Sequence, residues 1–128
     1  MSLKDSLRVM VVDDMSVSRA LIEQSLDEMG IKNYTTESDS RTALGKLAAN
    51  PVHLVISDMH MPGMTGLQLL GSLRQARATQ KIGFILITGS PSPEVVREGQ
   101  ELGLNNLVRK PFTTLSLKSS IERVVGRL

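Results

Sequence analysis

The sequence contains no cysteine and no tryptophan, and aromatic residues make up only 2% of it. The absence of cysteine excludes disulfides, thiolate catalysis and cysteine-ligated zinc or iron–sulfur sites, and it fits a reducing compartment. With so few aromatic rings, a surface on which nucleic-acid bases could stack is not expected. Neither sign of charge is in large excess, with 15 basic against 13 acidic residues. We therefore expect no nucleic-acid partner.

Long apolar runs are also missing. No stretch approaches the roughly 20 residues that a membrane-spanning helix needs, and no apolar signal-peptide core follows the first five residues. Internal repeats, low-complexity tracts and Pro/Ser-rich linkers are absent as well. We interpret residues 1–128 as one domain, large enough for its own core. We expect it to be cytoplasmic, without membrane contact, and monomeric.

What the sequence does contain is an alternation of apolar β-type runs and amphipathic helical segments. The expected strands span residues 8–12, 33–36, 54–58, 83–88 and 107–109. A helix is expected after each strand, because cap residues such as Ser16, Ser92 and Thr113 or Thr114 precede apolar repeats. Five strand–helix pairs with short connections predict right-handed crossovers and a parallel sheet covered on both faces. The fold class is therefore α/β, with five strands and five helices.

The first of these helices shows the repeat most clearly. Its apolar positions recur near helical spacing, at Val17, Leu21, Leu26 and Met29. This spacing is typical of the apolar face of an amphipathic helix. Gly30 follows directly and can supply the left-handed residue that ends a helix.

Polar side chains stand where the predicted strands end. Asp13 and Asp14 follow the first strand, Asp58 ends the third, Thr88 ends the fourth and Lys110 follows the fifth. Each has an ordinary explanation as a cap, a packed hydroxyl, a turn residue or a surface charge. All five, however, are expected at the carboxyl edge of one sheet, where open α/β sheets bind ligands. Their coincidence favours a site.

The chemistry of this edge follows from its charges. Three carboxylates at one edge repel one another unless a cation lies between them, and oxygen ligands favour Mg²⁺, or Mn²⁺ in its place. With the metal and Lys110 neutralising incoming charge, the Asp58 carboxylate can attack phosphorus and form an aspartyl-phosphate. Thr88 would then donate a hydrogen bond to a phosphoryl oxygen.

The segments that carry these residues resemble a known family. They are Val11–Asp14, the run from Ser57 to Gly66, Ile87–Gly89 and Lys110–Phe112. Together they are similar to the receiver domain of bacterial response regulators, over roughly residues 7–125, and most similar to stand-alone chemotaxis regulators of the CheY type. The resemblance implies a flavodoxin-like sheet in the order 2-1-3-4-5 and an output exerted through the domain's own surface.

The resemblance also implies a role for each residue of the edge. Asp58 would accept a phosphoryl group from a phosphohistidine on a sensor histidine kinase or its phosphotransfer domain. Asp14, Asp58 and the backbone carbonyl of His60 would bind Mg²⁺ directly, and Asp13 through water. Lys110 would pair with the phosphoryl group, Thr88 would move toward it, and the Lys110–Pro111 bond would be cis.

A second set of positions is implied around the entry to the site and the output surface. His60 and Ser90 would flank the entry and tune the loss of phosphate to water. Receivers of this type carry Tyr or Phe three residues before the lysine, whereas this chain has Leu107. Gly89 replaces a small Ala and leaves room beside Thr88, and Arg109 adds a guanidinium on the Leu107 side of the strand. Phosphorylation should survive these changes, which bear instead on its coupling to an output surface.

Three functions remain open at this point. The first is a phosphorylation-switched binding module, for which a flagellar motor switch protein is one candidate partner. The second is a phosphate sink that drains a shared kinase, an option that Leu107 favours. The third is an aspartate-nucleophile phosphatase of the haloacid dehalogenase type, but that family needs a second Asp where His60 stands. In the first two cases the chain is not an enzyme beyond its own phosphorylation and dephosphorylation.

Overall fold

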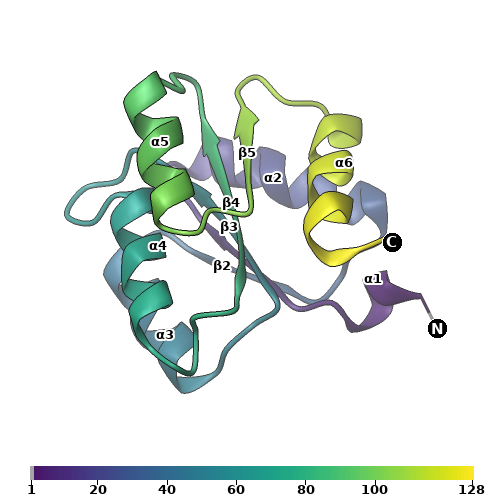
Figure 1. Cartoon of the computed structure of the whole chain (residues 1–128). Helices are drawn as coiled ribbons and strands as arrows, with labels where there is room; N and C mark the ends of the chain where they lie inside the picture. Colours follow the sequence, from purple (N-terminus) through teal and green to yellow (C-terminus); the bar gives the residue numbers. More distant parts are fainter. Residues whose placement is uncertain (1) are drawn as a thin grey trace.

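The computed structural model describes residues 2–128, which form a five-stranded parallel sheet with helices on both faces (Figure 1). The strands are β1 (Val9–Val12), β2 (Tyr34–Glu37), β3 (Leu54–Asp58), β4 (Gly83–Thr88) and β5 (Asn106–Arg109). The helices are α1 (Leu3–Ser6), α2 (Ser16–Met29), α3 (Ser40–Ala49), α4 (Gly66–Gln75), α5 (Pro93–Glu101) and α6 (Thr114–Val125). The strand order is β2-β1-β3-β4-β5, which confirms the predicted class and topology. The predicted bounds of β3 and β4 are correct, and those of the other strands differ by one residue.

The sequence of each strand matches its place in the sheet. Every residue of β1, β3 and β4 is buried, as expected for central strands covered on both faces. The edge strands β2 and β5 are more polar and partly exposed. Because the strands are parallel and in register, all of their carboxyl ends lie at one edge of the sheet.

Alternate side chains of the strands point into two core layers. One layer packs β-strand residues such as Ile56 against α2 and α6. The other packs residues such as Phe84, the largest fully buried side chain, against α3 and α4. Figure 1 shows α2 and α6 on one side of the sheet and α3, α4 and α5 on the other. Truncating a buried residue such as Ile56 to Ala is expected to cost about 2–5 kcal/mol.

Side-chain caps fix the start of four helices. Asp39, Thr65, Ser92 and Thr113 each accept a hydrogen bond from a backbone N–H in the first turn of the helix that follows. The expected cap at Ser16 is wrong, because Ser16 is already the first residue of α2 and Met15 occupies the cap position. At the other end of α2, Gly30 adopts the predicted left-handed conformation, with φ of 85°.

Two further expectations are corrected by the structure. The described residues contain six helices rather than five, because the short α1 precedes the first strand. On α2, the predicted apolar face is only half right: Leu26 and Met29 are buried, but Val17 is 71% exposed and Leu21 is 53% exposed. The face that packs on the sheet is instead completed by Ile22. None of the helices in residues 2–128 could span a bilayer, given their length and polarity.

Candidate functional site

Three carboxylates meet at the carboxyl edge of the sheet. The register of β1 against β3 pairs Val12 with Ser57, so the residues that follow β1 lie beside the end of β3. As a result, ligand oxygens of Asp13, Asp14 and Asp58 all lie within 4.8 Å of one another. The sequence prediction that these residues converge agrees with this geometry.

These carboxylates are withdrawn from solvent without being fully paired. Asp13 is completely buried and Asp58 is 6% exposed. Among the residues that the structure describes, Asp13 Oδ2 and Asp14 Oδ1 are buried oxygens without a hydrogen-bond partner. A buried anionic oxygen without a partner is costly, because it has lost its water and gained nothing in exchange. The donor set therefore fits a hard divalent cation.

Asp13 is fixed in place by the backbone around it. Its N–H donates to the carbonyl of Glu37 at 3.0 Å, and its Oδ1 accepts from the N–H of Met15 at 3.0 Å. The Arg19 guanidinium on α2 donates to the Asp13 carbonyl at 2.8 Å. One carboxylate oxygen of Asp13 is thereby used to shape the loop, which leaves the other for a ligand.

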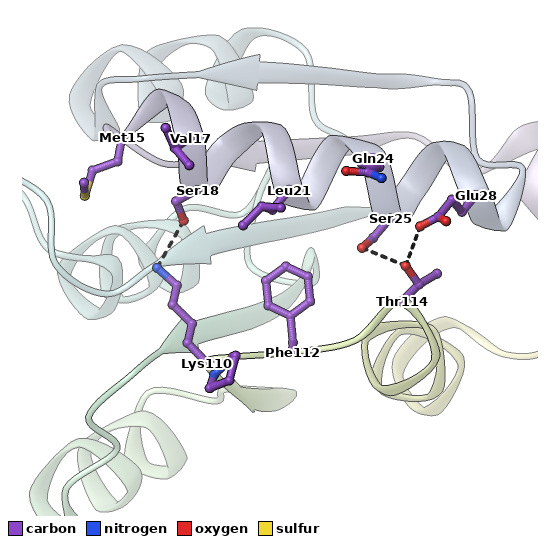
Figure 2. A pocket seen from close by; sticks show the side chains of 11 residues that line it. Met15, Val17, Ser18, Leu21, Gln24, Ser25, Glu28, Lys110, Phe112 and Thr114 are labelled. Carbon is purple, nitrogen blue, oxygen red and sulfur yellow. Dashed lines mark hydrogen bonds between the residues drawn. The ribbon is translucent and has the colours of Figure 1, made fainter.

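Lys110 supplies the positive charge of the site. Its Nζ lies 2.7 Å from Asp58 Oδ1 in an ion pair whose side chains are 30% and 8% exposed, respectively. The same Nζ donates a hydrogen bond to Ser18 Oγ on α2 at 3.2 Å (Figure 2). The Lys110–Pro111 peptide is cis, as the resemblance implied. A lysine next to the acidic group can neutralise an incoming anion.

Thr88 ends β4 at the same edge. Thr88 is completely buried, and its Oγ1 accepts a hydrogen bond from the N–H of Ser90 at 3.1 Å. The N–H of Lys110 donates to the Thr88 carbonyl at 2.9 Å, which ties the ends of β4 and β5 together. Gly89 and Ser90 are exposed beside them. A Cβ built on Gly89 would meet only Lys110 Cβ at 3.9 Å, which agrees with the predicted free space.

The loop after β3 is closed tightly against the strand end. The N–H of Gly66 donates to the Met59 carbonyl at 2.9 Å. A Cβ built on Gly66 would come within 2.5 Å of the Asp58 carbonyl, so this position needs glycine for close approach. His60 is exposed in this loop. The role of its backbone carbonyl as a metal ligand stays a prediction.

Leu107 and Arg109 lie on β5, which leads to Lys110. Leu107 is half-buried and packs against the core layer shared with α3 and α4. Arg109 is exposed. Their role in an output surface stays a prediction.

Sequence reasoning missed two side chains at this site, Ser18 and Arg19. Both lie on the first turns of α2, one bonded to Lys110 and the other to Asp13. Ser18 and Lys110 are 92 positions apart, so no local pattern links them. The only signal was that α2 begins directly after the acidic pair.

A groove of about 610 Å³ lies beside the site, between α2 and the loop after β5 (Figure 2). The exposed Val17 and Leu21 line it on α2, the exposed Met15 lines it just before α2, and Phe112 lines it from the loop. Lys110 also lines the groove, so its side chain has open space on one side.

Comparison with known proteins agrees with this geometry. The family model of the response regulator receiver domain matches residues 9–122. The chain belongs to the response regulator receiver family. This receiver is 37% identical over 128 residues to the probable chemotaxis protein CheY of Rhizobium etli, across 100% of this chain and 99% of that protein. It is 30% identical over 126 residues to chemotaxis protein CheY-3 of Vibrio cholerae, across 98% of this chain and 97% of that protein.

Solved structures show the same fold. The receiver resembles chemotaxis protein CheY4 of Vibrio cholerae with a TM-score of 0.86 and 29% identity, over 93% of this chain and 98% of that one. The receiver domain of sensor histidine kinase PA1611 from Pseudomonas aeruginosa superposes with a TM-score of 0.84, over 94% of this chain and 98% of that one. At 20% identity this second likeness shows the fold alone, and that structure holds a magnesium ion in its active-site cleft. The chain is therefore a CheY-like receiver of two-component signalling.

Proposed function

We propose that Asp58 accepts a phosphoryl group from the phosphohistidine of a sensor histidine kinase or of its phosphotransfer domain, with Mg²⁺ at the acidic edge. The observation that carries the proposal is the convergence of Asp13, Asp14 and Asp58 within 4.8 Å, with Lys110 Nζ 2.7 Å from Asp58. Membership of the receiver family supports it. We further propose a cytoplasmic location, because that is where such kinases are charged with phosphate.

The metal would be held directly by Asp14, Asp58 and the backbone carbonyl of His60, and by Asp13 through water. The two buried carboxylate oxygens without a partner support this assignment. All of these ligands are oxygens, so Mg²⁺ is preferred and Mn²⁺ could replace it. When bound, the metal supplies positive charge that offsets the repulsion between the carboxylates and the phosphoryl group.

The chain's own residues would carry the transfer. An Asp58 carboxylate oxygen attacks phosphorus, the phosphorus–nitrogen bond breaks, and its electron pair stays on the imidazole, which takes up a proton. Lys110 holds its ammonium against the charge that enters the site. Thr88 turns its hydroxyl toward a phosphoryl oxygen and gives up its bond to the Ser90 N–H. Water later attacks phosphorus and releases phosphate, so the chain acts on itself and turns over no separate substrate.

The nucleophile can be tested by exchanging Asp58 for Asn, which keeps the shape of the side chain and removes its charge. We expect wild-type protein with Mg²⁺ and phosphoramidate to gain one phosphoryl group by intact mass, and Asp58→Asn to gain none. Asp39→Asn is the matched control, because the Asp39 carboxylate caps α3, does not belong to the acidic cluster, and can be replaced by Asn, which caps helices equally well. Chelation of the metal should stop labelling of the wild type.

Labelling of Asp58→Asn at the wild-type rate would remove the nucleophile assignment. Equal loss of labelling in Asp39→Asn would indicate general damage to the fold instead.

A second candidate function, the phosphate sink, is favoured by Leu107. This residue is half-buried against the core and offers no ring that could turn inward when phosphate binds. The two functions differ in the step after phosphorylation. Binding to a flagellar switch peptide that strengthens with beryllofluoride, a stable phosphoryl mimic, would favour output. Rapid transfer from a phosphotransfer domain without any such binding would favour the sink.

A further inference from the structure

The Lys110 ammonium is shared between two acceptors. One is Asp58 Oδ1 at 2.7 Å, and the other is Ser18 Oγ at 3.2 Å (Figure 2). An ammonium has three donors on a flexible stem, and so its position is set by the acceptors that it finds. Of the two acceptors, only Asp58 belongs to the acidic cluster.

Packing does little to fix this ammonium. Lys110 lines the open groove between α2 and the loop after β5, and its side chain is 30% exposed. A lysine with solvent on one side samples several rotamers unless polar partners hold it. The hydroxyl of Ser18 is the partner on the groove side.

The two acceptors differ in what the proposed reaction does to them. When an Asp58 oxygen bonds to phosphorus, the carboxylate loses its full charge and becomes a weaker acceptor. The Ser18 hydroxyl takes no part in bond making or breaking, so its capacity to accept is the same before and after transfer.

We propose that Ser18 is a positioning residue for phosphoryl transfer, which keeps the Lys110 ammonium over the acceptor site while the Asp58 carboxylate is being consumed. This inference rests on the proposed function and adds a residue to it. Ser18 acts through Lys110, to which its side chain is hydrogen-bonded.

The place of Ser18 on α2 makes it a fixed point. Ser18 precedes Ile22 by four residues, so the two share a helix face, and Ile22 is completely buried in the core layer. One turn beyond, Ser25 bonds Thr114 on α6 at 3.1 Å, which anchors the same face to the neighbouring helix. The Cα of Ser18 can therefore move only if α2 shifts on the sheet, and its hydroxyl needs only the right χ1 rotamer to meet Lys110.

Helix stability would favour Ala at position 18. Ser has a lower helix propensity than Ala, and Ser18 lies inside α2. This gain offsets the loss of the bond to Lys110, so Ser18→Ala should unfold close to the wild-type temperature. A purely structural role for Ser18 predicts slower labelling only together with a clear loss of stability, so thermal unfolding recorded beside labelling separates the two interpretations.

The kinetic test uses the whole chain with Mg²⁺ and phosphoramidate as donor, followed by intact mass. For Ser18→Ala we expect the maximal labelling rate to fall about fivefold, as for one charge-assisted hydrogen bond at a half-exposed site. The donor concentration at half-maximal rate and the Mg²⁺ affinity should stay at their wild-type values, since Ser18 is no ligand of either. Ser18→Thr, which keeps the hydroxyl, should restore most of the rate.

Ser25→Ala is the matched control. It removes a hydroxyl from the same face of α2 but leaves the bond to Lys110 in place. Its labelling rate should equal that of wild type. The proposal is overturned if Ser18→Ala labels within about twofold of wild type, if Ser25→Ala slows labelling as much, or if a folded Ser18→Thr is as slow as Ser18→Ala.

A second measurement needs no phosphodonor. In the protein before phosphorylation, NMR can measure how fast the Lys110 ammonium protons exchange with water. This exchange should be faster in Ser18→Ala than in wild type or Ser25→Ala. Equal exchange in the three proteins would refute the placement of the ammonium. Failure of the wild type to be labelled would refute the proposed function and the role in transfer with it. Normal labelling in Ser18→Ala would refute the positioning role alone.

Discussion

At the scale of single residues, the site depends on how closely the backbone of one segment can approach another. Gly66 begins α4, and its Cα lies so near the end of β3 that a methyl group would collide with the Asp58 carbonyl at 2.5 Å and with Leu86 Cδ1 at 2.6 Å. A backbone atom cannot rotate away from such a contact as the end of a side chain can. Glycine at this position therefore belongs to the phosphoacceptor site even though it carries no chemistry.

Gly66→Ala should lower the free energy of unfolding by about 1–3 kcal/mol, as overpacking against backbone does. It should also slow the labelling of Asp58, because the end of β3 must move to relieve the contact. Gly71→Ala in the same helix is the control, since its Cβ would meet only Leu102 at an ordinary 3.6 Å. This control should gain about 0.5–1 kcal/mol from the better helix propensity of Ala. Urea unfolding measures both, and equal stabilities of the two variants would contradict the prediction.

At the scale of elements, a hydrogen bond between side chains joins α2 to the edge strand β2. The Tyr34 hydroxyl donates to Asp27 Oδ1 at 2.8 Å, and this bond, with smaller contributions from burial and nearby charge, raises the pKa of Tyr34 to about 12. Tyr34 is the only tyrosine and the chain has no tryptophan, so tyrosinate absorbance reports this contact alone.

The alkaline titration of Tyr34 tests this contact. The folded pKa lies above the ordinary value of 10.0, so the bond stabilises the fold below that pH, and this stabilisation is lost as the pH rises toward 12. Tyr34 is only partly buried, so the effect on stability should be small. Asp27→Asn should shift the tyrosinate midpoint down toward the ordinary value, and Tyr34→Phe should flatten stability against pH in this window. A wild-type midpoint at the ordinary value would show that the bond does not form in solution.

The sequence predicted the strands better than it predicted the helices. The strands were predictable because the buried runs are apolar and end abruptly in Asp58, Thr88 or a charged pair. The orientation of α2 was not, because its sequence carries more apolar positions than one face can bury. Val17 and Leu21 follow helical spacing as well as Ile22 and Leu26 do, and only the tertiary structure shows which face meets the sheet. The short α1 has no apolar repeat by which it could have been found.

The acidic site was more predictable than its supports. Parallel strands bring their carboxyl ends together, so Asp13, Asp14, Asp58 and Lys110 could be placed at one edge from topology alone. The bond from Lys110 to Ser18 joins positions 92 residues apart, and no periodicity encodes such a pairing.

At the scale of the whole molecule, one side chain at the opposite edge of the sheet links the segments that lead into β4 and β5. Arg74, in the last turn of α4, donates to the backbone carbonyls of Gln80 and Ile82 before β4, and to the Gly103 carbonyl and the Asn105 side-chain Oδ1 before β5. Burial lowers the pKa of Arg74, as expected for a guanidinium that has exchanged water for protein acceptors. The same Asn105 oxygen accepts from the N–H of Phe84, which extends the network into the sheet.

Arg74→Met should lower the free energy of unfolding by about 1–2 kcal/mol, because the part-buried Ile82 carbonyl loses its donor while the more exposed acceptors can bond to water instead. Arg74→Lys should recover little of this, since one ammonium cannot span acceptors in two segments. Arg77→Met, at an exposed position nearby, should stay within about 0.5 kcal/mol of wild type. Asp58 labelling should be normal in all three while they are folded. Denaturant unfolding measures the free energy of unfolding of each variant. An Arg74→Met variant as stable as wild type would show that the network is dispensable.

The position of β3 has a consequence for how a signal could leave this protein. β3 is the middle strand of five, bonded to β1 on one side and to β4 on the other. Its last residue, Asp58, pairs with Ile87 of β4, and the residue before it, Ser57, pairs with Val12 of β1. A strand held on both sides resists tilting, so we expect a chemical change at Asp58 to spread through the loops and side chains that surround the carboxylate.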